Sequence, residues 1–230
     1  MPKLPAFLQP IERAYVKWKM RNSRFAGSRT YWEERYAKGG NSGPGSYDRY
    51  AEFKARVMND LIERHGVRSA IEFGCGDGNQ LSMIRYPRYL GLDVSPTAIE
   101  GCRRKFASDP TSSFRLYEAG SFNPSDPGSR ADLTLSLDVL YHLVEDEVYG
   151  TYMEHLFASS DRLVVIYARD VDGPQTYHER NRSFTRFVRE RLPTWKQVEK
   201  IESPFMAEAR NEQDAANVAE FFIFAKEAGN

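Results

Sequence analysis

The sequence has few of the features that mark secreted, membrane-spanning or zinc-bound proteins. Its only two cysteines, Cys75 and Cys102, have a spacing that fits neither a disulfide framework nor a zinc site. No stretch approaches the roughly 18 apolar residues of a membrane span. Pro2, Pro5 and Pro10 interrupt the apolar run that a signal peptide would need. We therefore expect a reduced, cytoplasmic setting with no membrane partner.

A net charge is also missing. Basic and acidic side chains number 32 each among 230 residues, so no overall field attracts nucleic acid or an acidic membrane. The charge is unevenly spread, because residues 1–38 hold nine basic against three acidic side chains and so carry +6. This basic segment is open to two interpretations, a solvated helical face or a dock for an anionic partner or substrate.

The chain divides into an arm, a loop and a domain. Aromatic residues among the charges of residues 1–38 predict one or two short helices that lie on another part of the protein. The glycine-rich segment 39–46 cannot form the interior of a helix or strand. Apolar residues at helical spacing predict a helix over residues 47–65. We expect residues 1–46 to form an arm and a loop, and residues 47–230 to form one domain.

Short apolar segments alternate with helical patterns after Gly66. Strands are expected at 69–73, 89–92, 114–117, 133–137, 163–167 and 221–225. One helix is expected after the second strand, with Ser95 as N-cap, and another between the fourth and fifth strands. A loop is expected over residues 202–218. This alternation predicts parallel βαβ units with ligand sites at the carboxyl ends of the strands.

A run of glycines follows the first expected strand, where a helix should begin. Gly74, Gly76 and Gly78 let the backbone turn sharply and approach a ligand where a Cβ would collide. Glu72 lies near the end of that strand, and Asp93 ends the second strand 21 residues later. A carboxylate at that position can accept both hydroxyls of a ribose, so the two strand ends predict a nucleoside site.

The glycine spacing indicates which nucleoside is bound. A dinucleotide site has Gly-x-Gly-x-x-Gly, whereas Asn79 stands here at the last position. The run resembles the acid-x-Gly-x-Gly-x-Gly motif of class I S-adenosylmethionine-dependent methyltransferases. Residues 92–95 resemble that family's ribose-binding turn, and residues 137–143 resemble its fourth-strand motif beside the transferred methyl group. The resemblance covers about residues 66–170 and disfavours a nicotinamide oxidoreductase.

The resemblance implies an α/β fold with a Rossmann-like, seven-stranded and mostly parallel sheet. The last strand would be antiparallel, and helices would cover both faces of the sheet, with the N-terminal helical arm added. S-adenosylmethionine would be the cofactor.

Carried over residue by residue, the family pattern assigns the cofactor site to Glu72, Gly74, Cys75, Gly76, Asp93, Val94, Ser121, Phe122, Asp138 and Val139. The glycine turn, with Cys75 as a small contacting residue rather than a nucleophile, would approach the cofactor through its backbone. Glu72 would support that turn or the methionyl amine. Asp93 would bind the ribose.

The remaining five residues fall into two groups, one near the adenine and one near the methionine portion. Val94 would pack on the adenine, whose edge would lie near Ser121 and Phe122, although Ser121 stands where the family commonly has an acid. Asp138 and Val139 would border the methionine portion.

Two histidines are candidates for catalysis. Methyl transfer depends mainly on holding the acceptor in line with the sulfonium, but an oxygen or nitrogen acceptor can also need a base. His142 directly follows the fourth strand and His178 follows the fifth. Each has a structural alternative, whereas His65 and His155 are expected to be structural only, the latter on a solvent-facing helical position. No cluster of His, Asp and Glu marks a metal site, and none is expected.

Three functions remain open from the sequence. The first is a small-molecule methyltransferase acting on an oxygen of a sugar or other metabolite. The second is a methyltransferase for RNA or protein that uses the basic arm, although the Asn/Asp-Pro-Pro-Tyr/Phe signature of N-methylation is absent after the fourth strand. The third is a non-catalytic module that binds S-adenosylmethionine. Segment 39–46 is either a lid over the site or a linker.

Overall fold

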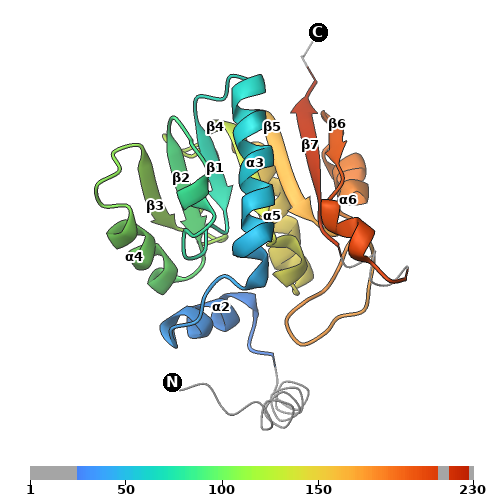
Figure 1. Ribbon diagram of the computed structural model, residues 1–230, viewed down its shortest axis with the longest axis horizontal. Coiled ribbons are helices and arrows are strands. Elements are labelled where there is room, and N and C mark those ends of the chain that lie inside the picture. The colour runs from blue at the N-terminus through green and yellow to red at the C-terminus, as the bar shows by residue number, and fades with distance from the viewer. Residues whose placement is uncertain (1–24, 212–217, 228–230) are drawn as a thin grey trace.

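A seven-stranded sheet forms the centre of the protein (Figure 1). The structure is a computed structural model that describes residues 25–211 and 218–227. The strand order is β3-β2-β1-β4-β5-β7-β6. The strands are β1 (Ala70–Phe73), β2 (Tyr89–Asp93), β3 (Ser112–Leu116), β4 (Ala131–Leu137), β5 (Ser160–Ala168), β6 (Trp195–Ile201) and β7 (Glu220–Lys226).

The sheet is parallel from β3 through β5, and β7 runs antiparallel to both β5 and β6. The predicted mostly parallel sheet with an antiparallel last strand is therefore confirmed. The parallel strands end at one edge of the sheet, which brings together the residues that follow β1, β2 and β4.

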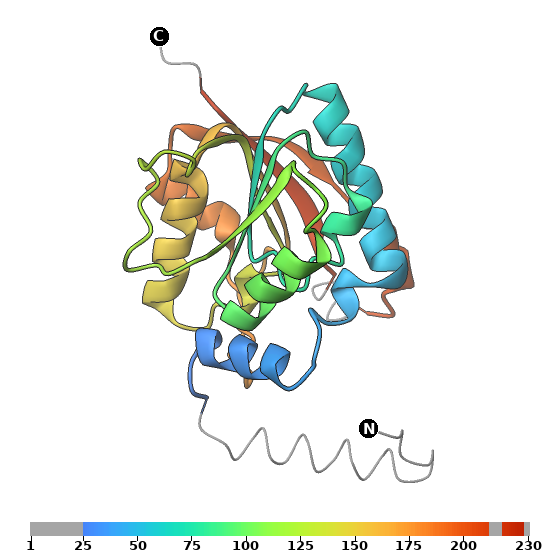
Figure 2. The ribbon, with the colours of Figure 1, turned by 90° about the vertical axis from the view of Figure 1, so that its left-hand side faces the viewer.

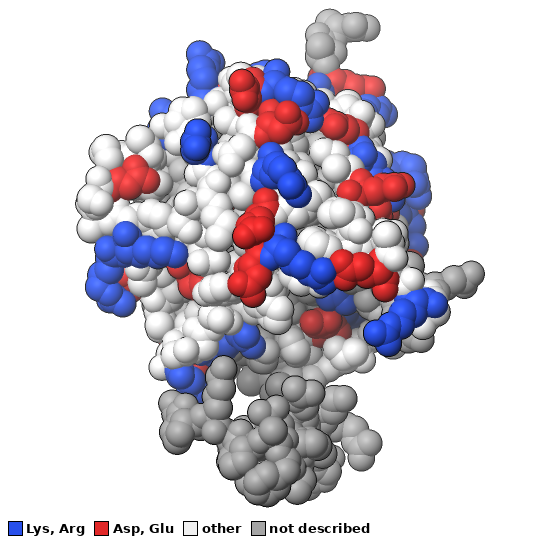
Figure 3. All heavy atoms as spheres, in the orientation of Figure 1, with Lys and Arg blue, Asp and Glu red and all other residues white. Residues whose placement is uncertain are grey.

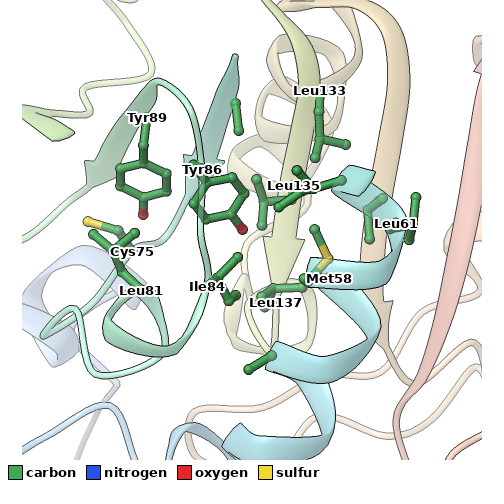
Figure 4. Packing of buried hydrophobic residues seen from close by; sticks show 14 of the residues in the cluster. Met58, Leu61, Cys75, Leu81, Ile84, Tyr86, Tyr89, Leu133, Leu135 and Leu137 are labelled. Atoms are coloured by element: carbon green, nitrogen blue, oxygen red, sulfur yellow. The ribbon is translucent and has the colours of Figure 1, made fainter. Parts of the chain in front are cut away.

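Helices cover both faces of the sheet (Figures 1 and 2). α3 (Asp48–Arg64) and α4 (Pro96–Lys105) pack on one face, and α5 (Asp146–Ala158) and α6 (Phe184–Arg191) pack on the other. α3 forms because its apolar residues recur on one side. Met58 and Leu61 on that side are fully buried against Leu135 and its neighbours on β4 (Figure 4).

Of the two helices expected near the glycine turn, one forms as predicted and the other does not. α4 begins as predicted, because the Ser95 side chain accepts a hydrogen bond from the Ala98 amide and Pro96 occupies the first turn. The helix expected between β1 and β2 is reduced to a short 3-10 turn, η2 (Leu81–Met83). Glycines at the start of this connection and Pro87 at its end leave little room for an α-helix.

The sequence did not predict α6 and β6. α6 has eight residues and buries only Phe184 and Val188. β6 is the edge strand beside β7, and most of its side chains are exposed or half-buried. Neither segment therefore carries a strong apolar pattern. Within the expected loop 202–218, residues 204–208 form the 3-10 helix η4 (Pro204–Glu208).

The described part of the arm lies across the carboxyl ends of the strands (Figures 1 and 2). It consists of α2 (Ser28–Ala37) and the loop that contains η1 (Pro44–Ser46). The Ser28 hydroxyl donates to Glu145 over 2.6 Å, and Glu33 accepts from Ser95 over 2.5 Å. Any helix in residues 1–24 lies outside the described residues, and the boundary expected at residue 46 stays a prediction.

The surface carries no large patch of one charge on the face seen in Figure 3, where Lys and Arg side chains are interspersed with Asp and Glu. The arm's described basic residues are partnered within the chain. Arg29 pairs with Glu118 and Lys38 pairs with Glu34, while Arg35 donates to the Asn41 carbonyl. None of the helices in the described residues has the length and apolar character needed to cross a membrane.

The packing of α3 gives a testable prediction. Met58 is fully buried, whereas Met83 is 37% exposed. We expect Met58→Ala to lower the free energy of unfolding by about 2–5 kcal/mol, because it leaves a cavity in the core. The matched change Met83→Ala should cost about 0.5 kcal/mol or less. Urea denaturation of both variants measures this, and equal losses would contradict the packing described.

Candidate cofactor and acceptor site

A cavity of about 300 Å³ lies at the carboxyl ends of β1, β2 and β4, beside α2. It is lined by eight of the ten residues predicted for the cofactor: Glu72, Gly74, Cys75, Gly76, Asp93, Val94, Asp138 and Val139. His142 lines it as well. The topology therefore brings together in space residues that are up to 70 positions apart in the chain.

The glycine turn is shaped by positive φ angles and close contacts. Gly74 and Gly76 have φ of 85° and 56°, which residues with a Cβ rarely adopt. A Cβ at position 74 would collide with Val139, and one at position 76 would collide with the Ser42 hydroxyl. Glycines at these two positions therefore allow the turn to pack closely against Val139 and against Ser42 of the glycine-rich loop.

Asp93 joins the two strand-end turns. Its Oδ2 accepts from the Gly76 amide over 2.9 Å, and its Oδ1 accepts from the Ser95 amide over 2.9 Å. Each oxygen keeps a further lone pair. Burial raises the pKa of Asp93 to about 6, above its ordinary value of 3.8, although these backbone hydrogen bonds act in the opposite direction.

Glu72 lies beneath the glycine turn and is 3% exposed. The Tyr89 hydroxyl donates to its Oε2 over 2.6 Å. Burial raises the pKa of Glu72 to about 7, which the Tyr89 hydrogen bond and the nearby Lys54 partly offset. These contacts are with Tyr89 and Lys54 and not with the glycine turn, so support of the turn by Glu72 stays a prediction.

Asp138 forms a buried ion pair that the sequence analysis missed. Lys54 of α3 donates to its Oδ2 over 2.5 Å, and the Tyr141 hydroxyl donates to its Oδ1 over 2.8 Å. Lys54 is fully buried. The signal was present, since Lys54 follows Tyr50 by four residues and precedes Val57 by three, which places it on the apolar side of the helix. A lysine there needs a buried partner.

The glycine-rich loop is tied to the cofactor turn through Asp77. The Ser42 amide donates to Asp77 over 2.9 Å, and the Tyr47 hydroxyl donates to the same carboxylate over 2.7 Å. The Tyr36 hydroxyl lies 3.0 Å from that of Ser42. Trp32, Tyr36 and Ser42 all line the cavity. The loop thus covers the site, while its opening as a lid stays a prediction.

Ser121 and Phe122 lie beside the cavity rather than in its lining. They border a separate, shallow hollow at the end of β3. The Phe122 ring packs on Phe73 and Tyr117, with ring centroids 5.6 and 5.4 Å apart. Tyr117 lines the cavity in this region. Contact of Ser121 and Phe122 with the adenine edge stays a prediction.

The two candidate catalytic histidines lie next to each other. Their ring centroids are 5.4 Å apart, and the His142 Nδ1 atom lies 3.3 Å from the His178 carbonyl oxygen. Burial lowers the pKa of His142 to about 4, so its ring is neutral near pH 7. His178 stacks on Tyr31 at 4.5 Å and lies outside the cavity lining.

The other two histidines lie outside the lining of the cavity. His155 is half-buried, and its Nδ1 atom lies 2.9 Å from the Tyr117 hydroxyl, so its expected exposure to solvent is wrong. His65 caps the carboxyl end of α3, as expected.

A second cavity, of about 370 Å³, adjoins the first at Asp138, which lines both. Tyr141, Tyr167 and Arg169, from the ends of β4 and β5, contribute to its wall. Arg169 donates to Glu179 over 3.1 Å, and its guanidinium lies 3.9 Å from the centre of the Tyr141 ring. The sequence did not predict this cavity, because its residues lie in separate segments that become neighbours only in the folded chain.

Comparison with known proteins identifies the class. Residues 71–164 match the family model described as a methyltransferase domain. The chain is 33% identical over 88 residues to a trans-aconitate 2-methyltransferase of Methylobacterium radiotolerans, covering 35% of this chain and 33% of the relative. It is 27% identical over 151 residues to a malonyl-[acyl-carrier protein] O-methyltransferase of Ilyobacter polytropus, covering 62% of this chain and 54% of the relative.

A solved structure agrees in fold. The N-methyltransferase NodS of Bradyrhizobium japonicum, crystallised with S-adenosylhomocysteine, superposes with a TM-score of 0.65 at 16% identity, covering 88% of this chain and all of NodS. Residues 71–164 therefore match a methyltransferase domain, and the fold is that of the S-adenosylhomocysteine-bound N-methyltransferase NodS. The domain match and the fold agree with the expected resemblance and with S-adenosylmethionine as the cofactor. The chain spans only one third to about half the length of the two curated relatives.

Asp93 gives a prediction for cofactor binding. Its ionised carboxylate accepts hydrogen bonds, so binding of S-adenosylhomocysteine should be independent of pH above 6 and should weaken below it, where Asp93 becomes protonated. Asp93→Asn should weaken binding by about 10–100-fold at pH 8, in line with about 1.5–3 kcal/mol for a hydrogen bond to a charged group. Calorimetry at several pH values tests both points, and an unchanged affinity in the variant would contradict them.

The hydrogen bonds between the glycine-rich loop and Asp77 give a second prediction. If residues 39–46 close over the bound cofactor, S-adenosylhomocysteine should slow protease cleavage near Gly43. Asp77→Asn weakens the tie by removing the charge that accepts from Ser42 and Tyr47, and should speed cleavage of the free protein. Cleavage rates that ignore the nucleoside would favour a simple linker.

Proposed function

We propose that the chain transfers a methyl group from S-adenosylmethionine to a carboxylate oxygen of a small metabolite. The acceptor would occupy the second cavity, with the cofactor in the first. Within the broader expectation of an oxygen in a sugar or other metabolite, this selects an anionic acceptor. The observation that carries the proposal is Arg169 in the wall of the second cavity, next to the point where the two cavities meet.

The second cavity has the chemistry to hold a carboxylate. Arg169 presents a planar cation that already donates to Glu179 over 3.1 Å, and a guanidinium can bind a second carboxylate through its other N–H groups. Its side chain is 13% exposed, so its interactions are only weakly screened by solvent. Tyr50 and Tyr167 also line the cavity and can donate to a bound anion, whereas the Tyr141 hydroxyl already donates to Asp138. An acceptor held here would lie next to Asp138, at the border with the cofactor cavity.

A carboxylate acceptor also fits the state of His142. S-adenosylmethionine supplies an activated methyl group, and a carboxylate that accepts it has no proton to lose. The chain's task is then to align the two reactants, which can contribute roughly 7–11 kcal/mol to lowering the barrier. His142 is not needed as a base. Both curated relatives are named for acceptors that contain carboxylic acids, aconitate and malonyl groups, which supports the same class here.

The test is methyl transfer from labelled S-adenosylmethionine to a panel of mono-, di- and tricarboxylates, sugars, phenols and RNA. We expect turnover with a carboxylate. Arg169→Gln should raise the KM for that acceptor by about 10–100-fold and leave the affinity for S-adenosylhomocysteine unchanged. Arg162→Gln is the matched control, because Arg162 is exposed near the opposite end of β5.

Two outcomes would contradict the proposal. Turnover with sugars or phenols alone would mean that the acceptor class is wrong. Cofactor binding without turnover on any acceptor would favour the non-catalytic module.

A further inference from the structure

His142, His178 and Glu179 form a cluster of metal-ligand type at the edge of the cofactor cavity. One donor atom from each residue lies within 4.8 Å of the other two. Ligands of a four-coordinate zinc ion, bound at about 2.0–2.2 Å, lie roughly 3.4 Å apart. The side chains would therefore need to close by about 1 Å, which a small change in rotamer on the 169–183 segment can supply.

The contacts around the cluster orient its members as a metal site requires. The His178 carbonyl can only accept a hydrogen bond, so His142 Nδ1, 3.3 Å away, is the donor. This fixes the tautomer of a neutral His142 and leaves Nε2 with its lone pair. A second ring nitrogen that donates to a carbonyl is typical of histidines that bind metals.

Glu179 is oriented in the same way. Its Oε2 accepts from Arg169 over 3.1 Å, while its Oε1 lies 3.8 Å from His178 Nε2. One carboxylate oxygen is thus held by a second residue, and the other faces the cluster.

His178 also has a second ring nitrogen, distinct from the Nε2 atom that lies near Glu179, without a partner among the described residues. Its Nδ1 is buried and makes no hydrogen bond to any described residue. Buried polar atoms of side chains are nearly always paired. The stacking of the ring on Tyr31 explains its orientation but leaves this nitrogen unsatisfied.

We propose that His142, His178 and Glu179 bind one divalent first-row transition-metal ion. Two imidazoles and one carboxylate favour zinc, manganese, iron(II) or cobalt over magnesium and calcium, which prefer all-oxygen sites. Three protein ligands leave at least one coordination position open. This site departs from the sequence-based expectation that no metal takes part, because residues 142 and 178–179 become neighbours only in the folded chain.

The ion would lie between the two cavities, since His142 lines the first and Glu179 binds Arg169 of the second. Its open position can take an oxygen of an anionic acceptor. This extension rests on the proposed function, whereas metal binding itself does not.

The experiment is a metal titration of untagged, chelator-treated protein. Calorimetry with Zn²⁺ and Mn²⁺, and the visible absorption of added Co²⁺, should show one ion per chain. His178→Ala and Glu179→Gln should each lower the affinity by at least about 10–100-fold, with thermal unfolding recorded to show that the variants remain folded. His65→Gln, at the far end of α3, is the control and should bind like the wild type.

Three outcomes would overturn the inference. These are no stoichiometric binding of any of the three ions, binding that His178→Ala and Glu179→Gln leave intact, and equal loss in His65→Gln. None of these measurements depends on methyl transfer. Failure of the metal site can therefore be distinguished from failure of the proposed carboxylate acceptor.

Discussion

The site depends on the hydrogen bonds that the Asp93 carboxylate accepts from the backbone. One oxygen binds the Gly76 amide in the turn after β1, and the other binds the Ser95 amide at the start of α4. These contacts hold two strand ends in a fixed relation within a buried setting. Removing a carboxylate from water is unfavourable. The two backbone hydrogen bonds therefore stabilise the buried Asp93 carboxylate, and the carboxylate in turn satisfies the two amides. The position of the glycine turn relative to the start of α4 follows from this arrangement.

The features that could be predicted from the sequence are those encoded locally. The glycine run and Asp93 lie in short segments whose spacing reflects one βαβ unit, so they could be assigned before the topology was known. The parallel strands were found because they are buried on both faces and therefore apolar. β6 and α6 were missed for the opposite reason, since an exposed edge strand and an eight-residue helix carry little apolar pattern.

The features that could not be predicted depend on tertiary contacts. Lys54 and Asp138 are 84 residues apart, and only the packing of α3 on β4 pairs them. Arg169 and Tyr141 belong to different strand ends that the sheet brings together. Ser121 and Phe122 show the converse. Family position suggests contact with the adenine edge, which stays a prediction, and the Phe122 ring packs against Phe73 and Tyr117 beside the cavity.

The loop over residues 39–46 has a consequence for the kinetics of a two-substrate reaction. Ser42 and Ser46 line the first cavity, while Pro44 and Gly45 line the second. One short segment is therefore a wall of both compartments, and a single displacement of it would expose both at once. Such shared access favours random order of substrate binding and release of both products through one opening. A strictly ordered mechanism would instead need a separate opening for each substrate.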